Sequence, residues 1–580
     1  MADWRAHSDP GVGADGGRRA GPWELDPFAQ QPPRPGNRWR ADAALRLAVR
    51  RTLSEAAGGG VELAGVADSW LDEIGRAGAV EMAPLAAAAE ASPPRHLPYD
   101  AWGARVDQVV VDPAWSALVA RSAELGMVAL PYERSFGPAS RVVQAAAIQL
   151  LDPVTATAMC PLSMTDACAG LLLRHDPDLA SSWVARLTAR TGGWTAGQWM
   201  TEKQGGSDVG RTATVAVESD LGDGTYRLRG TKWFTSATTA DVAVALARTP
   251  GAEPGSRGLS LFALSLRAPD GGWNGIRVRR LKEKLGTRAL PTAELDLDGT
   301  VAVPVGGLGR GVPKVAAVLH IARLWAAQAG PGATGHLLAL ARDYAVVRQV
   351  AGGRLADSAL HRSWLAEIAA SYEGMLQLSL RAAELVGLDE DRPGRAISPL
   401  ARVVLPMAKM ACSRQGFDAV SQLVESFGGA GYCEDTGIPQ TLRDVLVHCI
   451  WEGTGNVLAL DVVRALRDGD VAQALLEDVR AQLGRRPGPV ATRAEQAVRA
   501  ALPDLALMVA ADRPQAARDL AWSVARTYQL ALLVAHARWA HQVAGDPRPA
   551  VASELLASRP LLAAGPGGAD EVALAALALG

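Results

Sequence analysis

The sequence is poor in cysteine and histidine, and the few that it has are scattered. Five cysteines stand among 580 residues, and no two have the C-x-x-C spacing of a metal or redox site. The nine histidines show no H-E-x-x-H or similar ligand spacing. These absences argue against a disulfide framework and a zinc site. We therefore expect no bound metal and a reducing, cytoplasmic location.

Long apolar runs are also missing. No stretch of about 18 apolar residues could span a membrane, and residues 1–35 lack the apolar core of a secretory signal. Lysine is scarce, with six against 53 arginines, but the net charge is only -2 and the pI about 6.5. Neither value indicates nucleic acid or an anionic membrane as an obligatory partner.

What is present indicates a large globular enzyme. Hydrophobic residues make up 48% and charged residues 21%, and 580 residues exceed what one core can hold. We expect an α+β, mostly α, fold in five parts. These are an extended or disordered arm (1–37), a helical domain (38–190), a β-domain (191–305), an antiparallel helical bundle (306–465) and a helical extension (466–580).

The β-domain is predicted from short alternating segments separated by glycine-rich turns. Several strands at this spacing favour a small barrel or sandwich. The expected strands are Ala213–Glu218, Tyr226–Arg229, Val242–Arg248, Leu259–Leu266, Ile276–Leu281 and Ala293–Leu297.

The first candidate site is the loop from Gln198 to Asp208. Its paired glycines stand beside Thr201 and Ser207, so free backbone N–H groups and two hydroxyls could approach a flat polar ring or a pyrophosphate. An ordinary glycine-rich turn explains the same pattern.

The second candidate is the stretch Gly230–Ser236, where Trp233 and Phe234 precede hydroxyl residues. The aromatic pair could form a wall for a planar cofactor, or one ring could simply fill the core.

The third candidate is Glu452, between Trp451 and Gly453-Thr454-Gly455 at a break between helical runs. Partial burial would raise the pKa of Glu452 toward the value that a general base needs. Alternatively, Thr454 or Asn456 caps the following helix, and both interpretations can hold together.

Five segments in one order resemble the acyl-CoA dehydrogenase superfamily. Met200-Thr-Glu-Lys-Gln-Gly-Gly-Ser-Asp208 is similar to its M-T-E-x-x-x-G-S-D signature and Lys232-Trp-Phe-Thr-Ser236 to its K-x-W-I-T strand. Further matches are Leu281–Gly286, Phe427–Tyr432 and the Trp451-Glu-Gly-Thr454 that carries the family's catalytic glutamate. Details of these segments and the helical extension resemble the AidB-like, alkylation-response branch.

The resemblance implies an N-terminal helical domain, a middle β-barrel and a C-terminal four-helix bundle, followed here by an extra helical extension. It also implies bound FAD, an acyl-CoA or other acyl-thioester substrate, and a homotetramer arranged as a dimer of dimers. An electron-transfer flavoprotein is one acceptor that it allows.

The resemblance further assigns roles to individual residues. Glu452 would be the base, supported by Arg323, and Arg348 would bind the partner subunit's pyrophosphate. The other expected FAD contacts are Gln198, Met200, Thr201, Gly206, Ser207, Phe234, Ser236, Glu425, Gly428, Gly429, Thr454 and Asn456.

The implied reaction is α,β-desaturation of a short or branched acyl thioester, in which Glu452 removes the α-proton and the β-hydride passes to flavin N5. Hydrogen bonds to the thioester oxygen would stabilise the enolate. Some members carry the base one residue before the arginine at position 323; Ala322 stands there, which leaves Glu452.

Two other functions stay open at this stage. One is an AidB-like role in the response to DNA alkylation, with weak or no dehydrogenase activity; the other is a structural role with a vestigial flavin. Residues 465–580 contain 12 arginines and 12 acidic residues, a net charge of zero, which disfavours phosphate-driven DNA binding.

Overall fold

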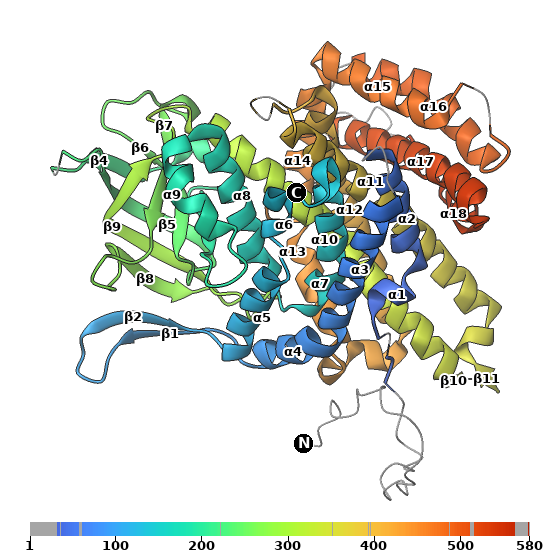
Figure 1. Ribbon diagram of the computed structural model, residues 1–580, viewed down its shortest axis with the longest axis horizontal. Helices are drawn as coiled ribbons and strands as arrows, with labels where there is room; N and C mark the ends of the chain where they lie inside the picture. Colours follow the sequence, from blue (N-terminus) through green and yellow to red (C-terminus); the bar gives the residue numbers. More distant parts are fainter. Residues whose placement is uncertain are drawn as a thin grey trace, which may run out of the picture.

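The structure, a computed structural model, describes residues 32–562 and 578, except residues 35, 57–60, 221, 351, 393, 395, 486–487 and 511–515. The predicted arm, residues 1–37, lies almost wholly outside the described residues. A β-barrel stands at one end of the molecule, helices fill the rest, and the last helices lie against the bundle (Figure 1).

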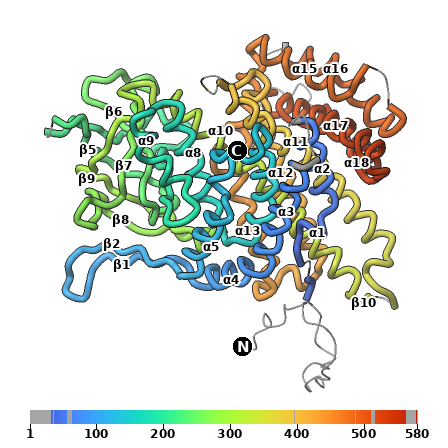
Figure 2. The backbone as a smooth tube through the Cα atoms, in the orientation of Figure 1, coloured from blue at the N-terminus to red at the C-terminus, as the bar shows by residue number. Residues whose placement is uncertain are grey.

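The N-terminal region is a helical layer between the barrel and the bundle. Its helices are α1 (Arg38–Ala41), α2 (Ala43–Ala56), α3 (Val61–Ala77), α4 (Ala83–Ala91), α5 (Pro113–Glu124), α6 (Ala129–Glu133), α7 (Ser140–Leu151), α8 (Met159–His175) and α9 (Pro177–Leu187). Every residue of α7 is buried, because this helix packs on α3 and on two bundle helices. Figure 2 shows α2 beside α11, although some 300 residues separate them.

One part of this region differs from the helix predicted there. Strands β1 (Arg95–Tyr99) and β2 (Arg105–Val110) form an antiparallel hairpin that reaches along the barrel. Pro98 and the β-branched residues of β2 favour extended backbone over helix. The positions of β1 that face inward are His96 and Pro98, and the buried residue of β2 is Asp107, so the hairpin lacks the apolar alternation that would predict strands.

The middle region is a closed β-barrel, as predicted. Strand β6 pairs with β4 and β7, β4 with β5, β5 with β9, and β9 with β7, which closes the ring; β3 and β8 flank it. The strands are β3 (Ala196–Trp199), β4 (Val215–Glu218), β5 (Tyr226–Ser236), β6 (Val242–Arg248), β7 (Leu259–Ser265), β8 (Ile276–Leu281) and β9 (Thr292–Pro304). The bounds predicted for β6 and β8 agree with the structure, but β3 was not predicted, and β5 and β9 extend well beyond the predicted segments.

The bundle is built from α10 (Gly311–Val347), α11 (Ala359–Glu390), α12 (Pro399–Ser426), α13 (Ile438–Val447) and α14 (Gly455–Leu466). A small hairpin, β10 (Gln349–Val350) and β11 (Gly353–Arg354), follows α10. Helices α10 and α12 touch backbone to backbone at Gly330 and Gly416, where an added Cβ would lie 2.0 Å from Cys412 O or 2.4 Å from Gly330 Cα. Only glycine permits this crossing.

The extension contains α15 (Gly469–Leu483), α16 (Thr492–Ala510), α17 (Ala517–Ala544) and α18 (Arg548–Ala557). Helix α17 is largely buried and packs against α11 and α14 of the bundle. None of the helices described in the structure is long and apolar enough to cross a membrane.

Candidate active site

Glu452 lies in a tight turn between α13 and α14. Its backbone has φ +56°, a left-handed conformation that residues other than glycine rarely adopt. Gly453 follows with φ +109°. Trp451 braces the turn: its Nε1 donates to His448 Nδ1 at 3.1 Å, and the two rings meet edge to face. The turn therefore carries the carboxylate in a specified and strained conformation.

Two cations surround this turn. Arg323 Nε donates to Glu452 O at a long 3.4 Å, and Arg323 Nη1 donates to Asp461 at 2.6 Å. Lys409 Nζ donates to Gly453 O at 2.6 Å. Burial raises the pKa of Glu452, and the charges of Arg323 and Lys409 oppose that rise.

The crossing of α10 and α12 at Gly330 and Gly416 explains why Arg323 and Lys409 both lie beside the Glu452 turn. Arg323 stands seven residues before Gly330 on α10, and Lys409 stands seven residues before Gly416 on α12. Seven residues are about two helical turns, so each side chain lies on the same face as its crossing glycine, about 10 Å along its helix from it.

Charged and polar side chains stand between the Glu452 turn and the barrel. The thiol of Cys160, on α8, lies close enough to Glu452 and to Lys284 for their charges to act on it, while burial raises its pKa to about 12. Lys284 Nζ donates to Thr292 Oγ1 at 3.1 Å, and that hydroxyl lies 3.2 Å from Ser236 Oγ. Ser236 is thereby linked through Thr292 to Lys284, and the charges of Lys284 and Glu452 both act on Cys160.

The predicted flavin loop is anchored by a buried ion pair. Glu202 accepts hydrogen bonds from Lys232 Nζ at 2.7 Å, from Thr214 Oγ1 at 2.5 Å and from the backbone of Ala213 at 2.7 Å. Burial would raise the pKa of Glu202, but Lys232 and the other donors outweigh it and lower the pKa. Trp233 N also donates to Thr201 O at 2.9 Å, so the loop is held against β5 at two points.

Several predicted flavin contacts are unpaired or exposed. Gln198 Nε2 is buried and has no hydrogen-bond partner. Phe234 is 51% exposed beside a bulge in β5, where one extra residue lies between Lys232 and Thr235. Gly206 and Ser207 are exposed, whereas Met200 is half-buried. The Phe234 ring has Lys282 Nζ 4.5 Å from its centroid, so it is only partly open to solvent. A buried donor without a partner and a half-exposed aromatic ring are features of a binding surface.

Position 206 favours glycine, because an added Cβ would lie 2.7 Å from Thr201 Oγ1. At the start of α14, Thr454 occupies the N-cap position without a side-chain capping bond, and both it and Asn456 are exposed beside Glu452. The predicted cap is therefore present in position, but its hydroxyl is free for another partner.

Four predicted residues lie elsewhere. Glu425, Gly428 and Gly429 stand exposed at the end of α12, and Arg348 follows the end of α10. Tyr344 and Phe427, with ring centroids 5.2 Å apart, bring these two helix ends together. Arg348 is 25 residues beyond Arg323, or about 37 Å along the helix, so this is a second group of residues apart from Glu452.

Sequence reasoning missed Lys409, Cys160 and Lys284, and it gave Glu202 and Lys232 no structural role. A signal existed in the lysines themselves. Only six are present in the chain, and five of them donate hydrogen bonds to specific partners; Lys232 and Lys409 are completely buried.

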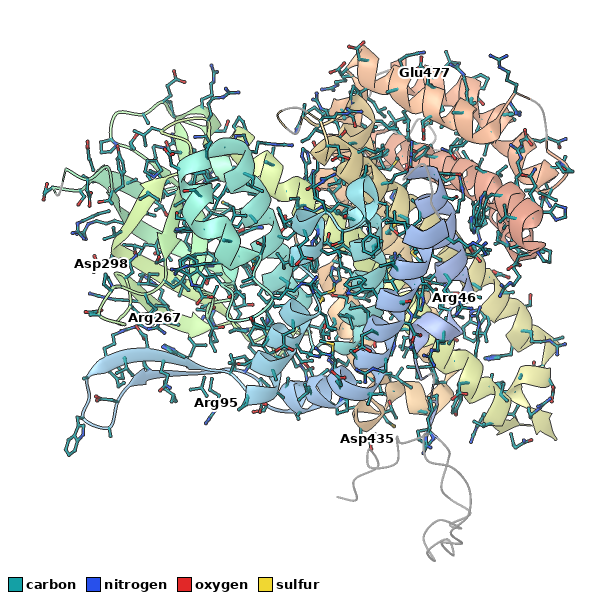
Figure 3. The ribbon with its side chains drawn as sticks, in the orientation of Figure 1. Arg46, Arg95, Arg267, Asp298, Asp435 and Glu477 are labelled. Atoms are coloured by element: carbon teal, nitrogen blue, oxygen red, sulfur yellow. The ribbon has the colours of Figure 1, made fainter. Side chains whose placement is uncertain are left out.

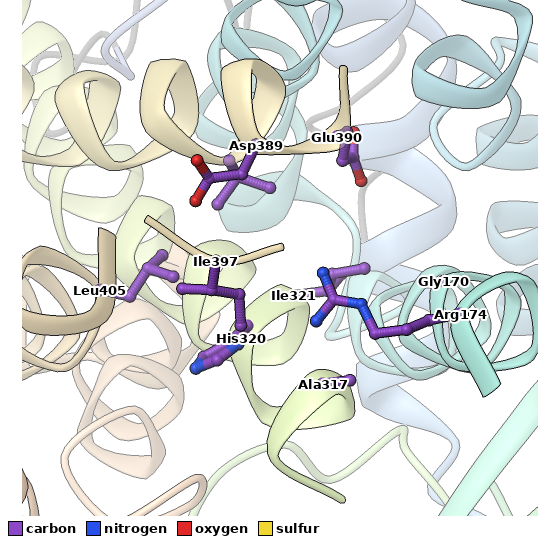
Figure 4. Close-up of a pocket in the computed structure, with 10 residues that line it drawn as sticks. Gly170, Arg174, Ala317, His320, Ile321, Asp389, Glu390, Ile397 and Leu405 are labelled. Atoms are coloured by element: carbon purple, nitrogen blue, oxygen red, sulfur yellow. The ribbon is translucent and has the colours of Figure 1, made fainter. Parts of the chain in front are cut away.

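A cavity of about 40 Å³ with a mostly apolar lining lies between α8, α10, α11 and α12 (Figure 4). Asp389 and Glu390 approach it from one side and His320 of α10 from the other; burial lowers the pKa of His320 to about 4. Ligand pockets usually measure about 300–1,000 Å³, so this cavity has room for a few waters and not for an acyl chain. No group of three or more His, Cys, Asp or Glu side chains that could hold a metal occurs within the described ranges.

Three domain families match consecutive parts of the chain. The adaptive response protein AidB N-terminal domain matches residues 30–192, the acyl-CoA dehydrogenase middle domain residues 197–300, and the acyl-CoA dehydrogenase C-terminal domain residues 309–467.

Full-length relatives agree. Acyl-CoA dehydrogenase family member 11 of Caenorhabditis elegans is 39% identical over 536 residues, which cover 88% of this chain and 86% of the relative. AidB of Escherichia coli (strain K12) is 34% identical over 443 residues, which cover 74% of this chain and 78% of that protein.

Solved structures show the same fold. The crystal structure of Caenorhabditis elegans ACDH-11 in complex with C11-CoA has a TM-score of 0.87 at 37% identity and covers 93% of this chain and 94% of that one. The apo form of Bd2924 has a TM-score of 0.80 at 39% identity, covering 88% and 100%. An acyl-CoA dehydrogenase of Bacillus anthracis complexed with FAD shares the fold, with a TM-score of 0.68 at 18% identity. The chain belongs to the acyl-CoA dehydrogenase family, in its AidB-like branch.

Proposed function

We propose that this protein is an FAD-dependent acyl-CoA dehydrogenase that desaturates an acyl thioester, with Glu452 as the base. The observation that carries the proposal is the Glu452 turn: a carboxylate with a raised pKa, presented in a strained conformation, with Arg323 and Lys409 beside it. Membership of the acyl-CoA dehydrogenase family supports the reaction type.

The residues around the barrel edge fit a flavin. Gln198 Nε2 is a buried donor without a partner, the Phe234 ring is half-exposed with Lys282 Nζ 4.5 Å from its centroid, and Gly206 and Ser207 offer exposed backbone and hydroxyl groups. Met200, Thr201 and Ser236 would complete the ring contacts, and Thr454 and Asn456 would close over the cofactor beside Glu452. Bound FAD would supply the hydride acceptor.

Glu452 must be ionised to remove the α-proton of the substrate. Burial favours its protonated form, and the charges of Arg323 and Lys409 favour the carboxylate that the reaction needs. Ala322, one residue before Arg323, offers no second carboxylate. The proton therefore moves from the substrate's α-carbon to Glu452 Oε.

The second group of residues would serve a neighbouring subunit. Arg348 is half-buried about 37 Å from Arg323 along α10, too far to share one catalytic centre with Glu452. Glu425, Gly428 and Gly429 stand exposed at the end of α12. In a dimer of dimers they would bind the pyrophosphate and adenine of a partner's FAD. The domain boundaries at 37, 190, 305 and 465 likewise remain predictions.

The test is the variant Glu452→Gln, with Glu477→Gln as its matched control. Glu477 lies on α15 of the extension, at the outer edge of the molecule (Figure 3). Each FAD-loaded protein is titrated anaerobically with short, branched and medium-chain acyl-CoAs while the visible flavin band is followed. We expect bleaching in the wild type and the control, and none in Glu452→Gln with FAD still bound. Undiminished reduction in Glu452→Gln would overturn the assignment of the base.

The AidB-like N-terminal domain favours one other function, protection of DNA or deactivation of alkylating agents. Duplex DNA binding would need free cations in the extension, but Arg499 and Arg538 pair with Glu495, and Arg548 pairs with Asp546. Titration of the whole protein with duplex DNA at low and high salt separates the two: salt-sensitive binding, together with a flavin that no acyl-CoA reduces, would favour the alkylation response.

A further inference from the structure

Lys409 is a buried cation with an unusual partner. Its side chain is completely buried on α12, and its ammonium donates at 2.6 Å to the backbone carbonyl of Gly453. Within the described part of the chain it forms no ion pair at 4.0 Å or less. A buried ammonium is costly unless its hydrogen bonds and nearby charges compensate it. Here the compensation comes from the turn that carries Glu452.

The hydrogen bond from Lys409 reaches a segment of backbone that lies outside regular secondary structure. Glu452 has φ +56° and Gly453 φ +109°, and the turn belongs to neither α13 nor α14. Its carbonyl oxygens therefore need donors from outside. Arg323 reaches Glu452 O only at 3.4 Å, so the shorter hydrogen bond to the turn is the one from Lys409, at 2.6 Å.

Helix α12 also holds the residues just before the turn. Cys449 Sγ lies 3.4 Å from Ser413 O, one helical turn beyond Lys409. The segment from Cys449 to Gly453 is thus tied to α12 at both ends, and α12 is itself pinned to α10 at the Gly330–Gly416 crossing. The position of the carboxylate depends on this frame.

We propose that Lys409 is a positioning residue of the site: its buried ammonium holds the Gly453 carbonyl and thereby keeps Glu452 in its left-handed turn, facing the substrate. This rests on the proposed function of Glu452. The charge of Lys409 also opposes the effect of burial on the carboxylate.

The test compares Lys409→Met and Lys409→Arg with a matched control, Lys314→Met. Lys314 is also a buried lysine that donates only to backbone carbonyls, those of Val305, Gly306, Gly307 and Gly309, but it is far from the Glu452 turn in the bonding network. The limiting rate of flavin reduction and the Kd for acyl-CoA are measured anaerobically on each FAD-loaded variant.

We expect Lys409→Met to lower the limiting rate about 10–100-fold, because a small displacement of a catalytic group costs this much. The Kd should change less than about threefold, and Lys409→Arg should recover most of the rate, because it keeps the charge and a donor. Equal losses in Lys409→Met and Lys314→Met, or an unchanged rate in Lys409→Met, would overturn the proposal.

A second measurement does not depend on activity. Hydrogen–deuterium exchange of the FAD-loaded proteins should be faster across residues 449–456 in Lys409→Met than in the wild type, and unchanged there in Lys314→Met. If Lys409→Met does not fold, Lys409→Gln takes its place. A wild type that no acyl-CoA reduces would refute the proposed reaction, whereas unchanged exchange in the Lys409 variant would refute the tether.

Discussion

Lys232 donates a hydrogen bond to Glu202 at 2.7 Å, and both side chains are buried beneath the loop that is proposed to contact the flavin. Each belongs to a different signature segment, Met200–Asp208 or Lys232–Ser236. The pair therefore gives a structural reason for both motifs: it joins the loop to strand β5. The predictions below follow from contacts of this kind.

Lys232→Met should lower the free energy of unfolding by about 3–5 kcal/mol, because loss of one partner leaves a buried charge uncompensated. Denaturant unfolding of the apo-protein measures the change. The double variant Glu202→Gln, Lys232→Met should recover a large part of it. A double variant no more stable than the single one would mean that the pair does not act as a unit.

Glu452→Gln should make the protein more stable while it abolishes activity. Folding raises the pKa of this acid above its ordinary value of 4.5, so the folded state holds the proton more tightly than the unfolded chain does. The stability that comes from this protonation is complete below pH 4.5 and is lost as the pH rises through the folded pKa. Glutamine stays neutral, so its advantage in Tm should be larger at pH 8 than at pH 5. The same advantage at both values would contradict the assigned cause.

Gln198→Leu should weaken FAD binding without harming the apo-protein. Gln198 Nε2 is buried and lacks a partner, so leucine removes an unsatisfied group while filling similar space. We expect the FAD affinity to fall by about 1–3 kcal/mol, as for the loss of a buried hydrogen bond. Fluorescence titration of apo-protein with FAD and thermal unfolding of the apo-protein check the two parts. A lower Tm of the apo-variant would show that the amide has a structural partner instead.

Gly453→Ala should destabilise the Glu452 turn by about 1–3 kcal/mol through backbone strain. The strain comes from φ +109° and not from crowding, because an added Cβ would meet Leu458 and Val457 only at an ordinary 3.4 Å. Gly455→Ala is the control, since its Cβ would have open space at the start of α14. Unfolding curves of the two variants should therefore diverge, and the flavin-reduction rate should fall only in Gly453→Ala.

Much of the fold could be predicted because its signals are local. Alternation and turn residues gave the bounds of β6 and β8, and the 3.6-residue period gave the long helices of the bundle. The hairpin β1–β2 and strand β3 were not predicted, because neither shows the apolar alternation of a half-buried strand. Whether such a segment forms a β-strand depends on the parts of the protein against which it packs.

The sequence by itself determined the order of the elements, the presence of a β-domain between two helical regions and the family, and it predicted Glu452 as the base. Only the tertiary structure decided what surrounds that carboxylate. Cys160, Arg323 and Lys409 lie between 43 and 292 residues before Glu452, and nothing in their local patterns brings them together. A glycine crossing between α10 and α12 brings Arg323 and Lys409 together, by allowing two backbones to touch, whereas Cys160 comes from α8. Proximity of charges depends on which helix faces meet, and that is settled by packing over the whole chain rather than by any single segment.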